Sequence, residues 1–224
     1  MSHALRKDMR FWDRAAASYA ASPIADKGGY EKSLQATRDR LTPNDHVLEI
    51  GCGTGTTALR LAPHTGYILA TDLSGEMIAI ARQKSSAEPF RNFRFEVGAV
   101  SALELEPESF DTVLAFNILH LVTSLETCLE EVYRVLKPGG LFISKTPCLS
   151  LMSPLIGVAV PVMQVLGKAP NVKILSPSQL EAAIAGAGFE NIEVEWHGTR
   201  GKDIRPFIVA RKGAGSSVVS KASD

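Results

Sequence analysis

The sequence is poor in cysteine, with three residues, Cys52, Cys128 and Cys148, among 224. The number is odd, and none of the three belongs to a Cys-x-x-Cys pair or clusters with histidine. This pattern argues against a disulfide framework and against a zinc site. No metal ligands are therefore predicted.

An excess of charge is also missing. The 24 Lys and Arg residues balance the 24 Asp and Glu residues, so the formal net charge is 0. Proteins that bind nucleic acid need a basic surplus or a basic stripe. We therefore expect no nucleic-acid partner.

The N-terminal residues 1–11 lack a long apolar core, so they do not form a signal peptide. Together with the low cysteine content, this predicts the reducing cytoplasm as the compartment.

Residues 146–167 contain no Asp, Glu, Lys or Arg. The segment is long enough to span a membrane. However, Pro147, Pro154 and Pro161 interrupt it, and each proline removes a backbone hydrogen-bond donor. We therefore expect no membrane span, but a small apolar cap, inserted over residues 146–175, that covers a binding pocket.

What the sequence does contain is an alternation of short apolar runs and helix-length segments. This order is typical of βαβ units around a parallel sheet. The expected strands cover residues 46–50, 67–71, 93–97, 112–116 and 141–145, and the expected helices cover 56–62, 75–86 and 125–136. A helix from Ser176-Pro177 to Ala187 and a hairpin of 191–196 with 206–211 follow the cap.

The domain organisation follows from this pattern. We expect one domain over residues 1–212, with a helical segment at 1–40 and a disordered tail at 213–224.

The most informative motif is Val47-Leu48-Glu49-Ile50-Gly51-Cys52-Gly53-Thr54-Gly55, in which a buried strand runs into a glycine-rich turn that opens a helix. The glycines let the backbone approach a ligand, and the helix N-terminus offers free N–H groups. Asp72 follows at the end of the second expected strand. A carboxylate at that place can accept both hydroxyls of a ribose.

Two classes of ligand fit this arrangement. Dinucleotide-binding enzymes have a third glycine at the position of Thr56, whereas here it is Gly55, one residue earlier. A negative charge on Glu49 would repel a pyrophosphate but not an ammonium group. S-adenosylmethionine has a ribose, a sulfonium and an ammonium but no phosphate, so the charges favour it.

The sequence resembles the class I S-adenosylmethionine-dependent methyltransferases, in their broad small-molecule subgroup. The resemblance rests on VLEIGCGTG (47–55), ATDLSGEMIAIAR (70–82), FDTV (110–113) and EEVYRVLKPGGLFI (130–143). It covers residues 45–146 well, but 176–211 only by the order of the expected elements.

The resemblance implies a set of cofactor-binding residues. Gly51, Gly53 and Gly55 would form the floor under the methionine part, with Glu49 beneath and Tyr19 covering the carboxylate. Asp72 would bind the ribose. The remaining cofactor-binding positions are Cys52 in the loop, Leu73 and Met77 beside the adenine, Ala99 and Val100 after the third strand, and Asn117 after the fourth.

The sequence departs from its relatives at two places. Many relatives have Gly-Asp-Ala after the third strand, where this chain has Gly98-Ala99-Val100 and therefore lacks a carboxylate for the adenine amino group. Asn117-Ile118-Leu119-His120 also differs from the Asn/Asp-Pro-Pro-Tyr/Phe motif of enzymes that methylate nitrogens in nucleic acids and proteins. The second difference disfavours macromolecular acceptors.

Simpler explanations exist for several of these residues. Asp72 could cap the helix that follows it, and Tyr19 could be a core aromatic residue. Trp12, in the N-terminal helical segment, is better explained by packing than by ligand recognition. His120 could be a structural histidine, and Cys52 a small residue required by a crowded loop.

The sequence therefore predicts an α/β fold with a doubly wound, seven-stranded, mostly parallel sheet and a small helical cap. The resemblance implies the strand order 3-2-1-4-5-7-6. The expected function is S-adenosylmethionine-dependent methyl transfer to a small, lipophilic acceptor, with His120 as the candidate base. The alternatives are a non-catalytic S-adenosylmethionine-binding protein and an NAD-dependent oxidoreductase.

Overall fold

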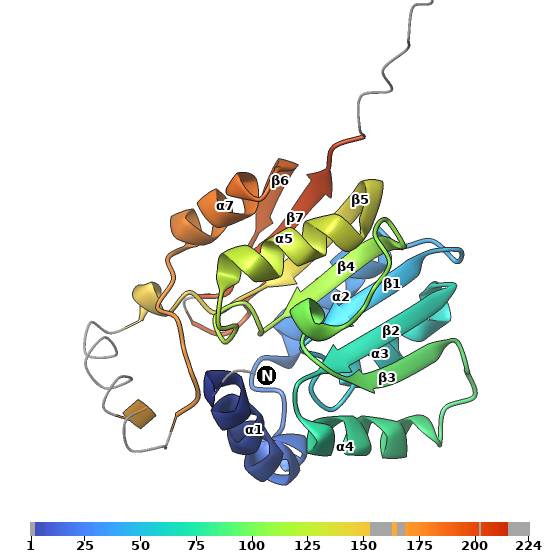
Figure 1. The fold of residues 1–224 in the computed structure, drawn as a ribbon, viewed down its shortest axis with the longest axis vertical. Helices are drawn as coiled ribbons and strands as arrows, with labels where there is room; N and C mark the ends of the chain where they lie inside the picture. Colours follow the sequence, from blue (N-terminus) through green and yellow to red (C-terminus); the bar gives the residue numbers. More distant parts are fainter. Residues whose placement is uncertain (1–2, 153–162, 165–168, 202, 215–224) are drawn as a thin grey trace, which may run out of the picture.

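The computed structural model describes residues 3–152, 163–164, 169–201 and 203–214 (Figure 1). Its centre is a seven-stranded sheet in the order β3-β2-β1-β4-β5-β7-β6. The strands are β1 (His46–Ile50), β2 (Tyr67–Asp72), β3 (Phe93–Val97), β4 (Phe110–Phe116), β5 (Leu136–Lys145), β6 (Phe189–Glu195) and β7 (Phe207–Lys212). Strand β7 runs antiparallel to both of its neighbours, β5 and β6. All pairs among the first five strands are parallel. The predicted fold class and strand order are confirmed.

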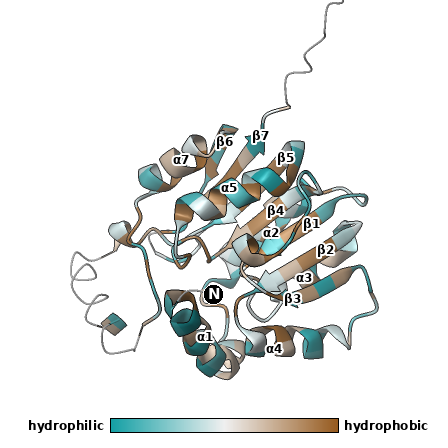
Figure 2. Ribbon diagram, in the orientation of Figure 1, coloured by the Kyte–Doolittle hydropathy of each residue, from teal (hydrophilic) through white to brown (hydrophobic). Residues whose placement is uncertain are grey.

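Helices cover both faces of the sheet. They are α1 (His3–Ala21), α2 (Lys27–Arg38), α3 (Thr56–Leu61), α4 (Gly75–Ser85), α5 (Leu125–Val135) and α7 (Pro177–Gly186). Buried side chains of α5 and α7 pack on one face, and those of α2, α3 and α4 pack on the other. Figure 2 shows the resulting pattern, with hydrophobic residues along the strands and hydrophilic ones on the outer sides of the helices.

Helix α1 belongs to neither layer. It lies beside α4, across the edge where the parallel strands end (Figure 1). The side chain of Ser74, which caps α4, donates a 2.6 Å hydrogen bond to Asp13 Oδ1 of α1. The predicted N-terminal helical segment therefore consists of two helices, of which the first forms a wall over the carboxyl edge of the sheet.

The element boundaries follow local chemistry. Ser176 forms a capping box with Gln179 at the start of α7, with Pro177 in its first turn, as predicted. The other predicted helix boundaries agree within one residue, and β6 begins two residues earlier than predicted, at Phe189.

Strand β5 differs from the prediction because it begins at Leu136 rather than Leu141. The run Lys137-Pro138-Gly139-Gly140, which lies between the predicted helix and the predicted strand, belongs to an irregular part of β5, where the register with β4 shifts. Gly139 adopts a φ of 78°, and a Cβ at Gly140 would lie 2.9 Å from the carbonyl oxygen of Asp111. The two glycines therefore allow a distorted strand to pass close to β4.

The predicted cap lies largely outside the described residues, which include only its ends, 146–152 and 169–175, and the pair 163–164. Most of the predicted tail, 215–224, also lies outside them. Among the helices that the structure describes, none combines the length and the apolar character that a membrane crossing requires.

Candidate functional site

Two connected cavities lie at the carboxyl ends of the parallel strands. The larger has a volume of about 800 Å³ and the smaller about 300 Å³. Both are lined by Tyr19, Gly51, Phe116, Asn117 and Arg205, so they meet at the ends of β1 and β4. The strand order reverses between these two strands, and this is where open α/β sheets bind ligands.

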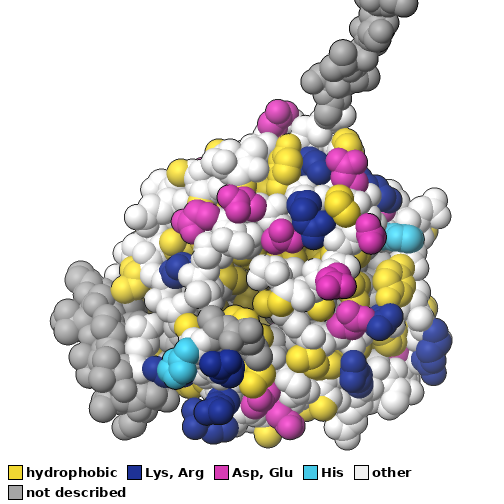
Figure 3. Space-filling view, viewed as in Figure 1, with side chains coloured by type: hydrophobic (Ala, Val, Ile, Leu, Met, Phe, Trp, Pro, Cys, Tyr) yellow, Lys and Arg dark blue, Asp and Glu magenta, His cyan; other side chains and the backbone are white. Residues whose placement is uncertain are grey.

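Most of the predicted site residues line these cavities. Glu49 and Cys52 line the smaller one. The larger cavity is lined by Tyr19, Gly51, Gly53, Asp72, Leu73, Met77, Ala99, Val100, Asn117 and His120. In Figure 3, hydrophobic side chains gather around the hollow in the middle of the face shown.

Gly51 and Gly53 have left-handed backbone conformations, with φ values of 65° and 54°. A Cβ at Gly51 would lie 2.5 Å from the Ile118 side chain, so this glycine is required by packing. A Cβ at Gly53 would meet only Tyr19, at 3.6 Å. The backbone at Gly53 is therefore open toward the cavity, as a close approach to a ligand requires.

Gly55 differs from the expectation because it lines neither cavity. A Cβ at this position would lie 2.7 Å from the Phe95 ring and 2.8 Å from Ala81. With a φ of 74°, Gly55 instead allows the loop to pack against α4 and β3. The structure assigns it to the packing beneath the loop and not to the cavity floor.

Asp72 joins two loops through its carboxylate. Oδ2 accepts a hydrogen bond from the Gly53 N–H, and Oδ1 accepts one from the Ser74 N–H, both at 2.9 Å. Burial raises the pKa of Asp72, although these bonds act in the opposite direction. Ser74, and not Asp72, caps α4, because its hydroxyl accepts a hydrogen bond from Met77 N. Asp72 therefore supports the loop geometry and also faces the larger cavity.

Glu49 is 2% exposed, and its Oε2 has no hydrogen-bond partner among the described residues. Burial raises its pKa to about 8. Near neutral pH the carboxyl is therefore mostly protonated when the cavity holds no cation. This corrects the argument that a permanent charge repels phosphate. A bound ammonium group would instead favour the ionised form of Glu49.

His120 lies in the turn after β4 and lines the larger cavity. Its Nδ1 is buried and has no hydrogen-bond partner among the described residues. Burial lowers its pKa to about 4, so the imidazole is neutral near pH 7. It can accept a proton or a hydrogen bond, but it is a weak base.

Cys52 is buried, and burial raises the pKa of its thiol well above the usual value. A thiol in this state is a poor nucleophile, in agreement with the interpretation of Cys52 as a small loop residue.

Helix α1 supplies residues that the sequence did not identify as part of a site. Leu5, Asp8 and Trp12 line the larger cavity, and the Trp12 ring makes an edge-on contact with Tyr19 at 6.3 Å. Asp8 Oδ1 also accepts a 2.9 Å hydrogen bond from Asn171 N. Tyr19 is half exposed, so it is not a core residue.

Other lining residues come from segments far apart in the sequence. They are Thr127 and Cys128 of α5, Pro147 and Leu149 after β5, Pro170 and Val172 before α7, and Arg205 before β7. The apolar character of residues 146–167 was the only signal in the sequence for this wall.

The comparisons with known proteins agree with this geometry. A family model described as "Methyltransferase domain" matches residues 41–194. A demethylmenaquinone methyltransferase from Symbiobacterium thermophilum is 31% identical over 64% of this chain and 58% of its own length. The ubiquinone/menaquinone biosynthesis C-methyltransferase UbiE from Geotalea daltonii is 31% identical over 69% of this chain and 74% of its own length.

Solved structures support the fold. A protein from Thermotoga maritima, described as a SAM-dependent methyltransferase and possible histamine N-methyltransferase, has a TM-score of 0.69 and 25% identity. The match covers 91% of this chain and 99% of that one. The YcgJ protein from Bacillus subtilis has a TM-score of 0.68 at 18% identity, over 83% of this chain and 100% of its own.

The glycine loop, the acidic residue at the end of β2, the strand order and these matches lead to one conclusion. The chain belongs to the class I S-adenosylmethionine-dependent methyltransferases.

Proposed function

We propose that this protein transfers a methyl group from S-adenosylmethionine to a small, lipophilic acceptor. The observation that carries the proposal is the pair of connected cavities at the ends of β1 and β4. The smaller one is rich in polar side chains, and the larger one is lined largely by apolar groups.

The residues fit the cofactor in three respects. Gly53 is open to the cavity, Asp72 presents a carboxylate to it, and Glu49 has a buried carboxyl oxygen without a partner. A ribose would be held by Asp72, and an ammonium group would lie beside Glu49. The adenine would lie between Leu73 and Met77 on one side and Ala99 and Val100 on the other.

The bound cofactor supplies a methyl group that is already activated by the sulfonium charge. The task of the protein is therefore mainly to hold the acceptor close to this group and in line with it. Trp12, Leu121 and Leu149 would pack against an apolar acceptor. Where the acceptor must lose a proton, the neutral imidazole of His120 is placed to receive it.

The relatives supply an acceptor class to test first. The names of the proteins from Symbiobacterium thermophilum and Geotalea daltonii state that they act on demethylmenaquinone or in ubiquinone/menaquinone biosynthesis. A quinone precursor is aromatic and lipophilic, which suits a cavity of about 800 Å³ with apolar walls.

A labelled-methyl assay tests the proposal. The protein is incubated with radiolabelled S-adenosylmethionine and a cell extract, and the products are separated into organic and aqueous fractions and identified by mass spectrometry. We expect label in a small product of the organic fraction, and none with the variant Gly53→Val.

Three other outcomes would contradict the proposal. Label only in the aqueous fraction would indicate a polar acceptor. Binding of S-adenosylhomocysteine without any labelled product would indicate a non-catalytic binding protein. Calorimetric binding of NAD in place of S-adenosylhomocysteine would indicate an oxidoreductase.

A further inference from the structure

Lys145 and Arg205 are cationic side chains that line the smaller cavity, and among the described residues neither has a carboxylate within ion-pair distance. Lys145, at the end of β5, lines this cavity and is 8% exposed. Arg205, before β7, lines both cavities. Neither forms an ion pair with another residue in the described part of the chain. Buried cations are normally paired, so an unpaired one in a cavity wall is a candidate ligand contact.

Asp203 and Asp26 are the acidic residues whose charges act on Lys145, and both accept backbone hydrogen bonds. Asp26 accepts hydrogen bonds from Gly29 N and Thr199 N, at 2.9 and 2.8 Å. Asp203 accepts them from Gly198 N at 2.6 Å and from the backbone N–H of Arg205 at 3.0 Å. These carboxylates satisfy backbone donors in the loops. Their charges act on the two cations, but in the described part of the chain they form no ion pair with Lys145 Nζ or the Arg205 guanidinium.

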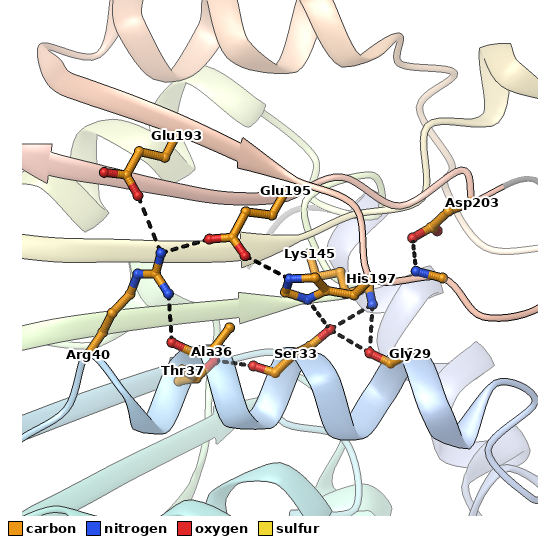
Figure 4. A network of polar contacts seen from close by, with 11 residues as sticks. Gly29, Ser33, Ala36, Thr37, Arg40, Lys145, Glu193, Glu195, His197 and Asp203 are labelled. Carbon is orange, nitrogen blue, oxygen red and sulfur yellow. Dashed lines mark hydrogen bonds and ion pairs between the residues drawn. The ribbon is translucent and has the colours of Figure 1, made fainter.

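A chain of hydrogen bonds, buried except at Glu195, holds Lys145 in place (Figure 4). Its Nζ donates to Ser33 Oγ at 2.7 Å and to the Gly29 carbonyl at 3.2 Å. Ser33 Oγ lies 3.0 Å from Nδ1 of His197, whose Nε2 lies 2.9 Å from Glu195. An ammonium group has three N–H donors, and these contacts use two of them. One donor of Lys145 therefore remains for a ligand.

Strand pairing places the two cations at one end of the sheet. Lys145 is the last residue of β5 and pairs with Phe207, two residues after Arg205. The Lys145 carbonyl also accepts a 2.7 Å hydrogen bond from the N–H of Asn117, at the junction of the two cavities. Both cations are therefore next to the point where the cofactor and the acceptor would meet.

The geometry points to an anion site in the smaller cavity, in which Lys145 and Arg205 bind a ligand carboxylate. A singly charged carboxylate suits the wall better than a dianion, because Glu49 lines the same cavity and would repel a second negative charge once ionised. A zwitterionic amino acid fits both groups, with its ammonium beside Glu49 and its carboxylate on Lys145. The carboxylate belongs either to the cofactor or to the acceptor. If it belongs to the cofactor, the inference rests on the proposed function.

Calorimetry with matched ligands tests the site. S-adenosylhomocysteine and 5′-methylthioadenosine share the adenosine and the sulfur, but only the first has the amino-acid carboxylate. We expect Lys145→Gln to weaken S-adenosylhomocysteine about tenfold or more, the effect of losing one charge-assisted hydrogen bond, and to leave 5′-methylthioadenosine unchanged. Arg205→Gln is a second test. Arg205 is less buried than Lys145, so this variant does not change a buried residue on which folding depends.

Lys32→Gln is the control, because it removes the same charge from an exposed position of α2, next to Ser33. A second ligand pair, 4-hydroxybenzoate and 4-hydroxybenzamide, tests the acceptor as the source. If the Lys145 and Arg205 variants lose only the benzoate, the carboxylate belongs to the acceptor.

The site is refuted if both variants bind all four ligands as the wild type does. It is equally refuted if the affinities for the two nucleosides fall by the same factor in both variants, because the carboxylate would then have no contact of its own. Failure of the wild type to bind either nucleoside would contradict the proposed function instead.

Discussion

The carboxylate of Asp72 accepts a 2.9 Å hydrogen bond from the backbone N–H of Gly53, so the end of β2 holds the glycine loop that follows β1. The same carboxylate accepts the N–H of Ser74 with its other oxygen. Each carboxylate oxygen has a second lone pair, so these bonds leave acceptors for a ribose. One side chain therefore shapes the loop and faces the ligand cavity.

This double role predicts two effects of Asp72→Ala. S-adenosylhomocysteine should bind about tenfold more weakly or worse, because the hydroxyls of the ribose lose a charged acceptor. The melting temperature should also fall, because two N–H groups lose their partner. Calorimetry and thermal unfolding measure the two effects, with the exposed Glu76→Ala as the control. A change in affinity of less than twofold would leave Asp72 with a structural role alone.

Gly53→Val should abolish the binding of S-adenosylhomocysteine, since its side chain would enter the open space beside Tyr19. Gly139→Val is a matched control, because Gly139 also has a positive φ, 78°, and open space around it, but lies in the distorted part of β5. Both variants should lose similar stability from backbone strain, while only the first loses binding. If Gly53→Val binds S-adenosylhomocysteine with the affinity of the wild type, the glycine loop is not part of the cofactor site.

The affinity for S-adenosylhomocysteine should depend on pH through Glu49. The pKa of this carboxyl is about 8 in the free protein, and an ammonium group beside it would lower that pKa in the complex. Binding then releases a proton below pH 8, so the affinity rises as the pH increases from 6 to 8 and levels off above it. Calorimetry in buffers of different ionisation enthalpy measures the released proton. The variant Glu49→Gln should release no proton on binding. If this variant still releases a proton, Glu49 is not its source.

His120→Ala tests the candidate base once an acceptor is known. The turnover rate should fall by roughly 10²-fold or more, with unchanged affinity for S-adenosylhomocysteine, if the imidazole accepts the proton of the acceptor. Because burial lowers the pKa of His120 to about 4, the wild-type rate should fall only as the pH drops through that value. His64→Ala, at an exposed position, is the control. An unchanged turnover rate would make His120 a structural residue.

Ala99→Asp should strengthen the binding of S-adenosylhomocysteine by up to about tenfold, because it would place a carboxylate in the cavity wall beside the proposed position of the adenine. The comparison variant is Ala102→Asp, which adds the same charge at an exposed position nearby. A crystal structure of the complex would locate the new carboxylate. If it lies beside the adenine and the affinity does not rise, the explanation is wrong.

Local chemistry in the sequence was sufficient to predict most of the helices and strands, whereas their order in the sheet was implied by the family resemblance. Alternating apolar runs and the Ser176-Pro177 capping signal predicted the elements, because their period and their end groups depend on neighbouring residues. The failure at β5 has a local cause as well. A Gly-Gly pair usually ends an element, and the contacts that hold Gly139 and Gly140 in the sheet come from distant segments. The irregular segment pairs with β4, and the Gly139 carbonyl accepts a hydrogen bond from Arg211 of β7.

The sequence by itself determined the family and most of the residues around the glycine loop, since these lie within short motifs at fixed spacing. The resemblance carried by the same motifs implied the strand order. Only the tertiary structure decided that Gly55 packs beneath the loop, that α1 forms a wall of the larger cavity, and that Lys145 and Arg205 line the smaller one. The charge state of Glu49 belongs to this second group. Its pKa depends on burial by residues from several helices and strands, and desolvation of this kind leaves no signal in the sequence near the residue.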